Sequence, residues 1–257
     1  MVTQYPPVEL PEETADDRAI TLTYLDLRKA IGIIGITLPF VLVLGKMLID
    51  GGGLQSSLSA YYYTSTRNYF IGAMCAMGVF LISYRYGSKS DWANRLTNLA
   101  SLAAIGVGLF PTAPKHATDA QLRLSQVHAI SAATFFIVLG FVSFFLFTSN
   151  QTKQERFRHE DWVYRGCGLT MWGSIIALGV SNASFASAAS DHRLLLILET
   201  LMVLAFGTSW LVKGQFLDSK TRAAVAHKVT LMYRGAPGAL GMRGHLRGHL
   251  RTPRHSH

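Results

Sequence analysis

Charged residues are scarce in this chain, which argues against an ordinary soluble domain. They make up 15% of the 257 residues, whereas soluble domains carry about 25%. Two cysteines are too few for a disulfide framework. The Walker, GxSxG and HExxH patterns do not occur in the sequence, which disfavours nucleotide-driven and hydrolytic enzymes of those types. We therefore favour a non-enzymatic role and expect no cofactor.

A cleavable signal peptide is not expected either. Such a peptide begins with basic residues and becomes apolar at once. Residues 1–24 instead combine prolines with acidic side chains, namely Glu9, Glu12, Glu13, Asp16 and Asp17. We expect residues 1–24 to form a disordered cytoplasmic tail.

In place of charge, the sequence has long apolar runs. A helix rises about 1.5 Å per residue, so about 20 apolar residues cross the hydrocarbon core of a bilayer. The alternation typical of a membrane barrel is absent. We therefore predict an all-α fold, a polytopic helical membrane bundle over residues 25–215. Its six transmembrane helices are expected at 30–49, 67–84, 94–111, 127–148, 168–187 and 193–213.

The distribution of basic residues predicts the orientation of this bundle. With six spans, the N-terminal tail, the second and fourth loops and the C-terminal tail hold 19 of the 24 lysines and arginines. Loops rich in these residues stay in the cytoplasm, so both termini are predicted to lie on the cytoplasmic side of the plasma membrane. The alternation also supports the second and third segments, which are short, and the fifth, which polar residues dilute. Small residues predict close helix contacts, with Gly72, Ala73 and Ala76 (a Gly72-x3-Ala76 spacing) in the second segment and Ala103, Ala104, Gly106 and Gly108 in the third.

The stretch SLSAYYYTSTRNYF, residues 57–70, leads into the second segment from the outer side. Tyrosines concentrate at the membrane–water boundary, so an aromatic belt is the simplest interpretation. Three consecutive tyrosines cannot all face lipid, however, because they spread over about 200 degrees of a helix. At least one should point into the bundle. Arg67 is expected to bind a lipid headgroup or to complete an inward polar site.

Further polar residues near the outer side predict a pocket. His128 lies at the start of the fourth segment, His192 opens the sixth, and Glu199 lies two helical turns deeper on nearly the same face. An ionisable group at that depth is costly in hydrocarbon and is a functional hypothesis by default. We predict an outer-side pocket lined by Tyr62, Arg67, His128, His192 and Glu199. Structural roles stay open, with each histidine as a helix cap and Glu199 as a protonated or paired group.

A resemblance to known membrane proteins lies in three stretches: SAYYYTSTRNYFIGAMCAMGVFLISY (59–84), GVGLFPT (106–112) and the AISAATFFIVLGF that follows His128. These resemble uncharacterised six-span membrane proteins of bacteria. More loosely, the chain is similar over residues 25–215 to the DRAM/Sfk-type helical membrane proteins (damage-regulated autophagy modulators and relatives). The resemblance implies a six-helix bundle, but no particular reaction or cofactor.

A fainter similarity is to the membrane hydrolases of the alkaline-ceramidase and progestin-receptor-like group, which hold zinc. Ser59, His128 and His192 match their site in residue type, but the paired histidines of the last helix and a seventh span are missing. Catalytic zinc needs three protein ligands and an open position. Here His128, His192 and Glu199 would have to supply them. A metal-dependent membrane lipid hydrolase is thus one alternative, and a small proton-linked transporter that uses Glu199 is another.

Residues 216–257 form a basic tail that ends in MRGHLRGHLRTPRHSH. Each basic group near anionic cytoplasmic lipid contributes about 1 kcal/mol, so membrane lipids are the expected partners. Nucleic acid is not expected, because no recognisable nucleic-acid-binding fold surrounds the basic residues. We expect residues 216–232 to lie on the membrane surface as an amphipathic helix. The whole pattern predicts a structural, lipid-interacting or sensory membrane protein, and leaves open whether it is a homo-oligomer.

Overall fold

The structure, a computed structural model, describes residues 15–83, 91–114, 116–149, 159–184 and 192–235. Among these, only the backbone is described at 15–25, 149, 159, 182–184, 192 and 215–235. The chain divides into two compact units, Met1–Gln215 and Phe216–His257. The boundary between the units falls inside the last helix.

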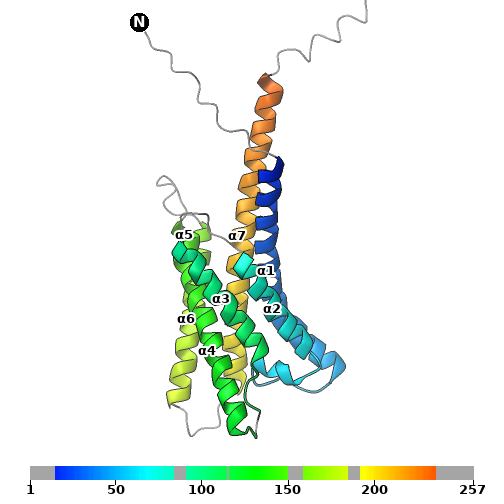
Figure 1. Cartoon of the computed structure of the whole chain (residues 1–257), viewed down its shortest axis with the longest axis vertical. Coiled ribbons are helices and arrows are strands. Elements are labelled where there is room, and N and C mark those ends of the chain that lie inside the picture. Colours follow the sequence, from blue (N-terminus) through cyan, green and yellow to red (C-terminus); the bar gives the residue numbers. More distant parts are fainter. Residues whose placement is uncertain (1–14, 84–90, 115, 150–158, 185–191, 236–257) are drawn as a thin grey trace, which may run out of the picture. The chain divides into compact units, whose positions relative to one another are not determined.

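Every secondary-structure element in the described residues is helical, which confirms the predicted all-α fold (Figure 1). The long helices are α1 (Ala15–Ile49), α2 (Arg67–Ser83), α3 (Asp91–Leu109), α4 (Asp119–Phe141), α6 (His159–Ser184) and α7 (His192–Gly235). The 3₁₀ helix η1 (Ser59–Tyr63) precedes α2, while the π-helical turn η2 (Val142–Leu146) and α5 (Phe147–Ser149) extend α4.

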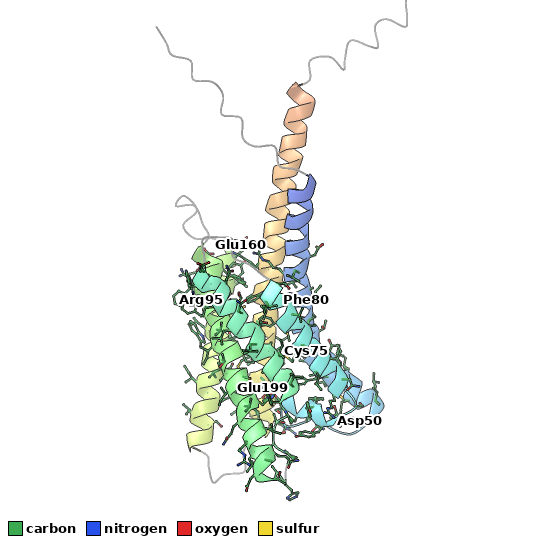
Figure 2. The ribbon with its side chains drawn as sticks, viewed as in Figure 1. Asp50, Cys75, Phe80, Arg95, Glu160 and Glu199 are labelled. Atoms are coloured by element: carbon green, nitrogen blue, oxygen red, sulfur yellow. The ribbon has the colours of Figure 1, made fainter. Side chains whose placement is uncertain are left out.

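Successive long helices of the first unit run in opposite directions (Figure 1). The ends of α1, α3 and α6 and the starts of α2, α4 and α7 therefore lie at one end, which we call the η1 end. At the opposite end, α7 lies against α1: a Cβ added at Gly214 would be 3.2 Å from Lys29 Cγ. Figure 2 places Asp50 and Glu199 towards the η1 end, and Arg95 and Glu160 towards the other.

Three helices of the described residues are long and apolar enough to cross a membrane. They are Asp26–Ile49, Asp119–Leu146 and Arg193–Gly214, and Arg67–Ser83 is apolar but shorter. Their outer surface is apolar as well, since Leu48 is 85% exposed and Ile130 67%. Apolar surface of this extent marks a contact with lipid or protein rather than with water. Length and composition thus support membrane helices at three of the six predicted positions.

Helix α4 begins at Asp119, ahead of the predicted start at residue 127, because a capping box fixes its first turn. The Thr118 hydroxyl accepts a hydrogen bond from the backbone N–H of Gln121, and the Gln121 side chain accepts one from the backbone N–H of Thr118 at 2.9 Å. Reciprocal bonds of this kind satisfy two of the amides that a helix start leaves unpaired.

Glycines bring α1 and α7 into direct backbone contact. A Cβ added at Gly207 would lie 2.7 Å from the backbone nitrogen of Ile36, and one at Gly35 would lie 2.9 Å from the Cα of Gly207. Such small-residue contacts let two membrane helices gain dispersion energy along their backbones.

The contact predicted at Gly72 is wrong, because nothing lies within 4 Å of a Cβ built there. The contacts predicted at Gly106 and Gly108 of α3 are confirmed, since an added Cβ would lie 2.5 Å from Ser131 Oγ of α4 and 3.1 Å from Met74 Cβ of α2, respectively.

A buried lysine connects α7 to the first residue of α5. Lys213 is 8% exposed, and its ammonium donates a hydrogen bond of 2.7 Å to the backbone carbonyl of Phe147. The ammonium also lies 5.3 Å from the ring centroids of both Phe147 and Tyr164. A cation is favourable at a helix C-terminus, where carbonyls lack partners, and over aromatic faces.

Candidate functional site

A cavity of about 820 Å³ lies between the helices, towards the η1 end. Its lining comes from the segment before and within η1, from α2, from the α3–α4 connection, and from α4, α6 and α7. A volume of this size falls in the range of sites that enclose a small organic ligand.

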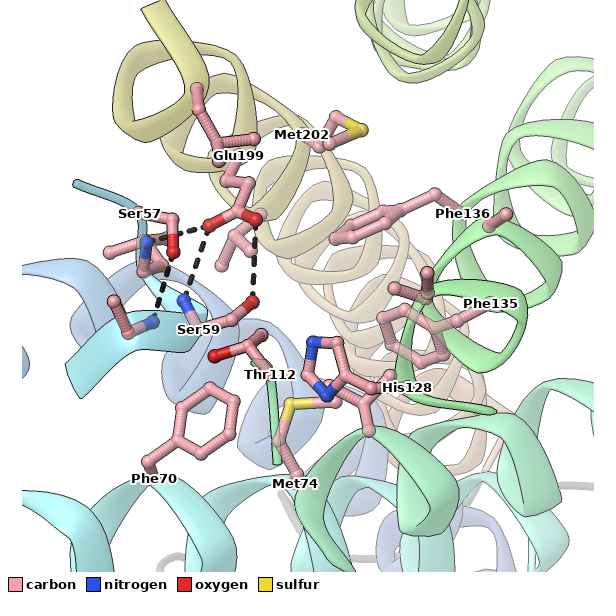
Figure 3. A pocket seen from close by; sticks show the side chains of 18 of the residues that line it. Ser57, Ser59, Phe70, Met74, Thr112, His128, Phe135, Phe136, Glu199 and Met202 are labelled. Carbon is pink, nitrogen blue, oxygen red and sulfur yellow. Dashed lines mark hydrogen bonds between the residues drawn. The ribbon is translucent and has the colours of Figure 1, made fainter. Parts of the chain in front are cut away.

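The two sides of the cavity differ in chemistry. Figure 3 shows Ser57, Ser59 and Glu199 grouped together, with Thr112 and His128 next to them. Phe135, Phe136 and Met202 lie on the other side, and Phe70 and Met74 lie below. The polar lining residues include Ser57, Ser59, Thr112, Ser125, His128 and Glu199. The apolar ones include Phe70, Met74, Phe135, Phe136, Met202 and Phe206. An apolar volume with a few polar groups at one side suits an amphiphilic ligand.

Glu199 reaches from α7 to the start of η1. Its Oε2 atom accepts hydrogen bonds from the backbone N–H groups of Leu58 at 2.6 Å and Ser59 at 3.2 Å. Its Oε1 atom accepts one from the Ser59 hydroxyl at 3.3 Å. Leu58, the N-cap residue of η1, has no side chain that could satisfy these amides. The carboxylate of a distant helix therefore caps η1 and holds that segment against the cavity.

His128 lines the same cavity from α4 and is 4% exposed. Its Nδ1 atom is 2.7 Å from the backbone carbonyl of Phe110, just beyond the end of α3. Because a carbonyl only accepts, Nδ1 carries the hydrogen and donates it, which leaves Nε2 of a neutral ring as an acceptor. His128 is therefore a cap, as one sequence interpretation expected, but for the end of α3 rather than for the start of its own helix.

Tyr62 and Arg67 pair with each other and are not among the cavity-lining residues. The Arg67 guanidinium donates a 2.7 Å hydrogen bond to the Tyr62 hydroxyl and lies 4.3 Å from the centroid of the Tyr62 ring. Tyr61 is fully buried, which confirms that one of the three tyrosines points into the bundle. Tyr63 lines the cavity. Partial burial and the neighbouring Tyr62 raise the pKa of Tyr63, so its hydroxyl stays protonated and donates to the carbonyl of Thr112.

The backbone of His192 begins α7, but its side chain lies outside the described residues. Of the predicted pocket residues, the structure thus brings His128 and Glu199 to one cavity. The described part of the chain contains no group of three His, Cys, Asp or Glu side chains that could hold a metal ion. The zinc set of His128, His192 and Glu199 therefore gains no support from geometry.

Sequence reasoning missed the residues that shape the segment between α1 and η1. Lys46 is buried, and its ammonium donates to the carbonyls of Gly51 at 2.6 Å and Gly53 at 2.7 Å. Asp50 accepts a 3.0 Å hydrogen bond from the backbone N–H of Ser65. The only sequence signal was the GGG triplet: Gly51 and Gly52 have φ values of 69° and 71°, which glycine adopts at little cost.

No family model, curated protein or solved structure matches this chain. The resemblance to the DRAM/Sfk-type proteins stays a prediction from the three quoted stretches.

Proposed function

We propose that this protein is a six-span integral membrane protein of the plasma membrane that binds an amphiphilic molecule in the cavity at its η1 end. The cavity itself is the observation that carries the proposal. It joins a polar side, which includes Glu199 and His128, to an apolar side made of phenyl rings and methionines. A molecule with a polar head and an apolar chain fills both sides at once.

The orientation we propose follows from the basic residues. The end opposite the η1 end holds the start of the membrane part of α1, the end of α2 and the starts of α3 and α6 (Figure 1), and basic residues concentrate in the sequence next to these helix ends. Segments of this charge remain in the cytoplasm. Both termini are then cytoplasmic, and the η1 end faces outward. The polar side of the cavity lies close to the outer membrane–water boundary, where the head of an outer-leaflet lipid also lies.

Thiol labelling tests this topology. In a chain with Cys75→Ser and Cys167→Ala, we introduce Leu54→Cys in the α1–α2 connection or Lys153→Cys in the 150–158 connection. An impermeant thiol reagent added to intact cells should label the first variant, whereas the second should react only after lysis. Labelling of Lys153→Cys in intact cells would contradict the orientation.

Binding is better supported than catalysis. The Ser59 hydroxyl donates to Glu199, and His128 Nδ1 is engaged by the Phe110 carbonyl. In the described residues, no hydrogen bond joins Ser59 to His128, as a serine nucleophile and its base would require. The hydrolase and transporter alternatives gain no specific support.

Photolabelling tests the ligand site. A hexadecyl probe with a diazirine in its chain is irradiated with the purified full chain in nanodiscs, and labelled peptides are mapped. Labelling should concentrate on cavity-lining stretches of α4 and α7. Ala132→Phe places a ring in the cavity and should reduce this labelling strongly. The matched control Ile130→Phe, at a position that is 67% exposed, should not. Equal labelling of Ala132→Phe and Ile130→Phe would contradict the proposal that the cavity binds the probe.

A further inference from the structure

We propose that the cavity selects amphiphiles whose head carries a hydrogen-bond donor and no negative charge, namely alcohols and amines, over those with a carboxylate or phosphate head. This inference rests on the proposed function, because it concerns the head of the molecule that fills the same cavity. It comes from the donor and acceptor inventory of the polar side.

The polar side offers acceptors to a ligand. The Glu199 carboxylate receives three hydrogen bonds from Leu58 and Ser59, whereas a carboxylate has about four lone-pair sites. At least one site is left for a ligand donor. His128 Nε2 is a second acceptor, because Nδ1 donates to Phe110. Ser57 already has its oxygen engaged by the N–H of Ala60 at 2.9 Å, so its hydroxyl hydrogen is the donor that the ligand oxygen would meet.

The same side offers no cation to a ligand. Among the described residues that line the cavity, none is a lysine or an arginine. The two cations that flank η1 in sequence are engaged elsewhere: the Lys46 ammonium binds the carbonyls of Gly51 and Gly53, and Arg67 binds Tyr62. Arg123 and Arg193, each two residues before a lining residue, are not among the residues that line the cavity. An anionic head would therefore enter a low-dielectric site beside Glu199 with no opposite charge to offset its desolvation.

The acceptors and the lack of a cation thus rank the head groups. An ammonium or a hydroxyl donates hydrogen bonds to the acceptors, and the hydroxyl also accepts one. A carboxylate or phosphate has no hydrogen to donate to these acceptors and meets no cation, which weakens its binding by at least about tenfold. Lys115, which follows the lining residue Pro114, lies outside the described residues and enters the test as a variant.

The test compares four diazirine probes that share one hexadecyl chain and differ in the head, which is a hydroxyl, an amine, a carboxylate or a phosphate. Each is crosslinked to the purified full chain in nanodiscs, and labelling of the cavity peptides is quantified. We expect the hydroxyl and amine probes to label at least about tenfold more efficiently than the carboxylate and phosphate probes. Carboxylate labelling equal to hydroxyl labelling overturns the selectivity and leaves the cavity function standing. Absence of cavity labelling by all four probes overturns the proposed function instead.

Two variants identify the source of the selectivity. Glu199→Gln keeps an oxygen that can accept from Leu58 and Ser59 but replaces the other acceptor oxygen with an amide N–H that donates, so the ratio of carboxylate labelling to hydroxyl labelling should rise about tenfold. Lys115→Gln should leave the ratio unchanged, and a lower anion signal in that variant would mean that Lys115 supplies the missing cation, which contradicts the proposal. If Glu199→Gln does not fold, the relative labelling of the unmodified chain by the four probes still tests the selectivity.

Discussion

Replacing Glu199 with alanine should loosen η1 and lower the stability of the whole bundle. The carboxylate is the acceptor for two backbone amides, those of Leu58 and Ser59. Both residues are buried, at 3% and 8% exposure, so water does not readily replace the lost partner. Each buried amide left without an acceptor costs about 1–3 kcal/mol. Together the two amides predict a loss of about 3 kcal/mol, and more if the Ser59 hydroxyl is also left unpaired.

Thermal unfolding of the detergent-solubilised protein measures this loss. Cys167 is buried, so a thiol-reactive fluorophore reports the opening of the bundle. For a chain of about this size, 1 kcal/mol shifts Tm by about 2–4 °C, so Glu199→Ala should lower Tm by about 6–12 °C. Glu199→Gln should recover most of this loss, because the amide oxygen still accepts.

Thr200→Ala is the matched control for this prediction. It alters the next residue of α7, whose hydroxyl bonds only to the Leu196 carbonyl of its own helix, at 2.7 Å. The expected change in Tm is below about 3 °C, since the control leaves no inter-helix group unpaired. A Tm for Glu199→Ala equal to that of Thr200→Ala would refute the assignment of Glu199 as the cap of η1.

Three further substitutions probe the helix contacts in the same unfolding assay. Gly207→Ala places a methyl group 2.7 Å from the Ile36 backbone nitrogen and should destabilise the fold by about 1–3 kcal/mol. Gly72→Ala, where a Cβ meets open space, should be neutral or stabilising by up to about 1 kcal/mol. Similar losses of stability in Gly207→Ala and Gly72→Ala would show that α1 and α7 do not touch as described. Lys213→Met keeps the apolar stem but leaves the Phe147 carbonyl without its ammonium partner. We expect it to lower the free energy of unfolding by about 1–3 kcal/mol. An unchanged Tm would mean that burying the cation costs as much as its contacts contribute.

Local patterns made the helices predictable, because helix formation and apolar length are written in consecutive residues. The second segment, predicted at 67–84, forms as Arg67–Ser83. The depth of Glu199 in an apolar run likewise marks it as a candidate site residue from sequence alone. Its partners could not be predicted. Leu58 lies 141 residues away in the chain and offers a backbone amide, which nearly every residue type has, so the sequence does not indicate the contact.

The contacts between helices were predictable only in part. Small residues correctly marked the packing of α3 at Gly106 and Gly108, but not at Gly72 of α2. The close approach of α1 to α7 at Gly35 and Gly207 was not predicted, because the crossing of two whole helices decides which glycine meets a neighbour. The burial of Lys46 was also not predicted, because it depends on how the carbonyls of Gly51 and Gly53 fold back towards its ammonium.

The meeting of α1 with α7 has a consequence for biosynthesis. The ribosome delivers the first membrane helix long before the last. The face of α1 that carries Gly35 therefore has no helix to pack against until nearly the whole chain has been made. Closure of the bundle is then a late event, and a nascent chain that stops before Gly207 would leave that face open to chaperones, to lipid or to the quality-control machinery.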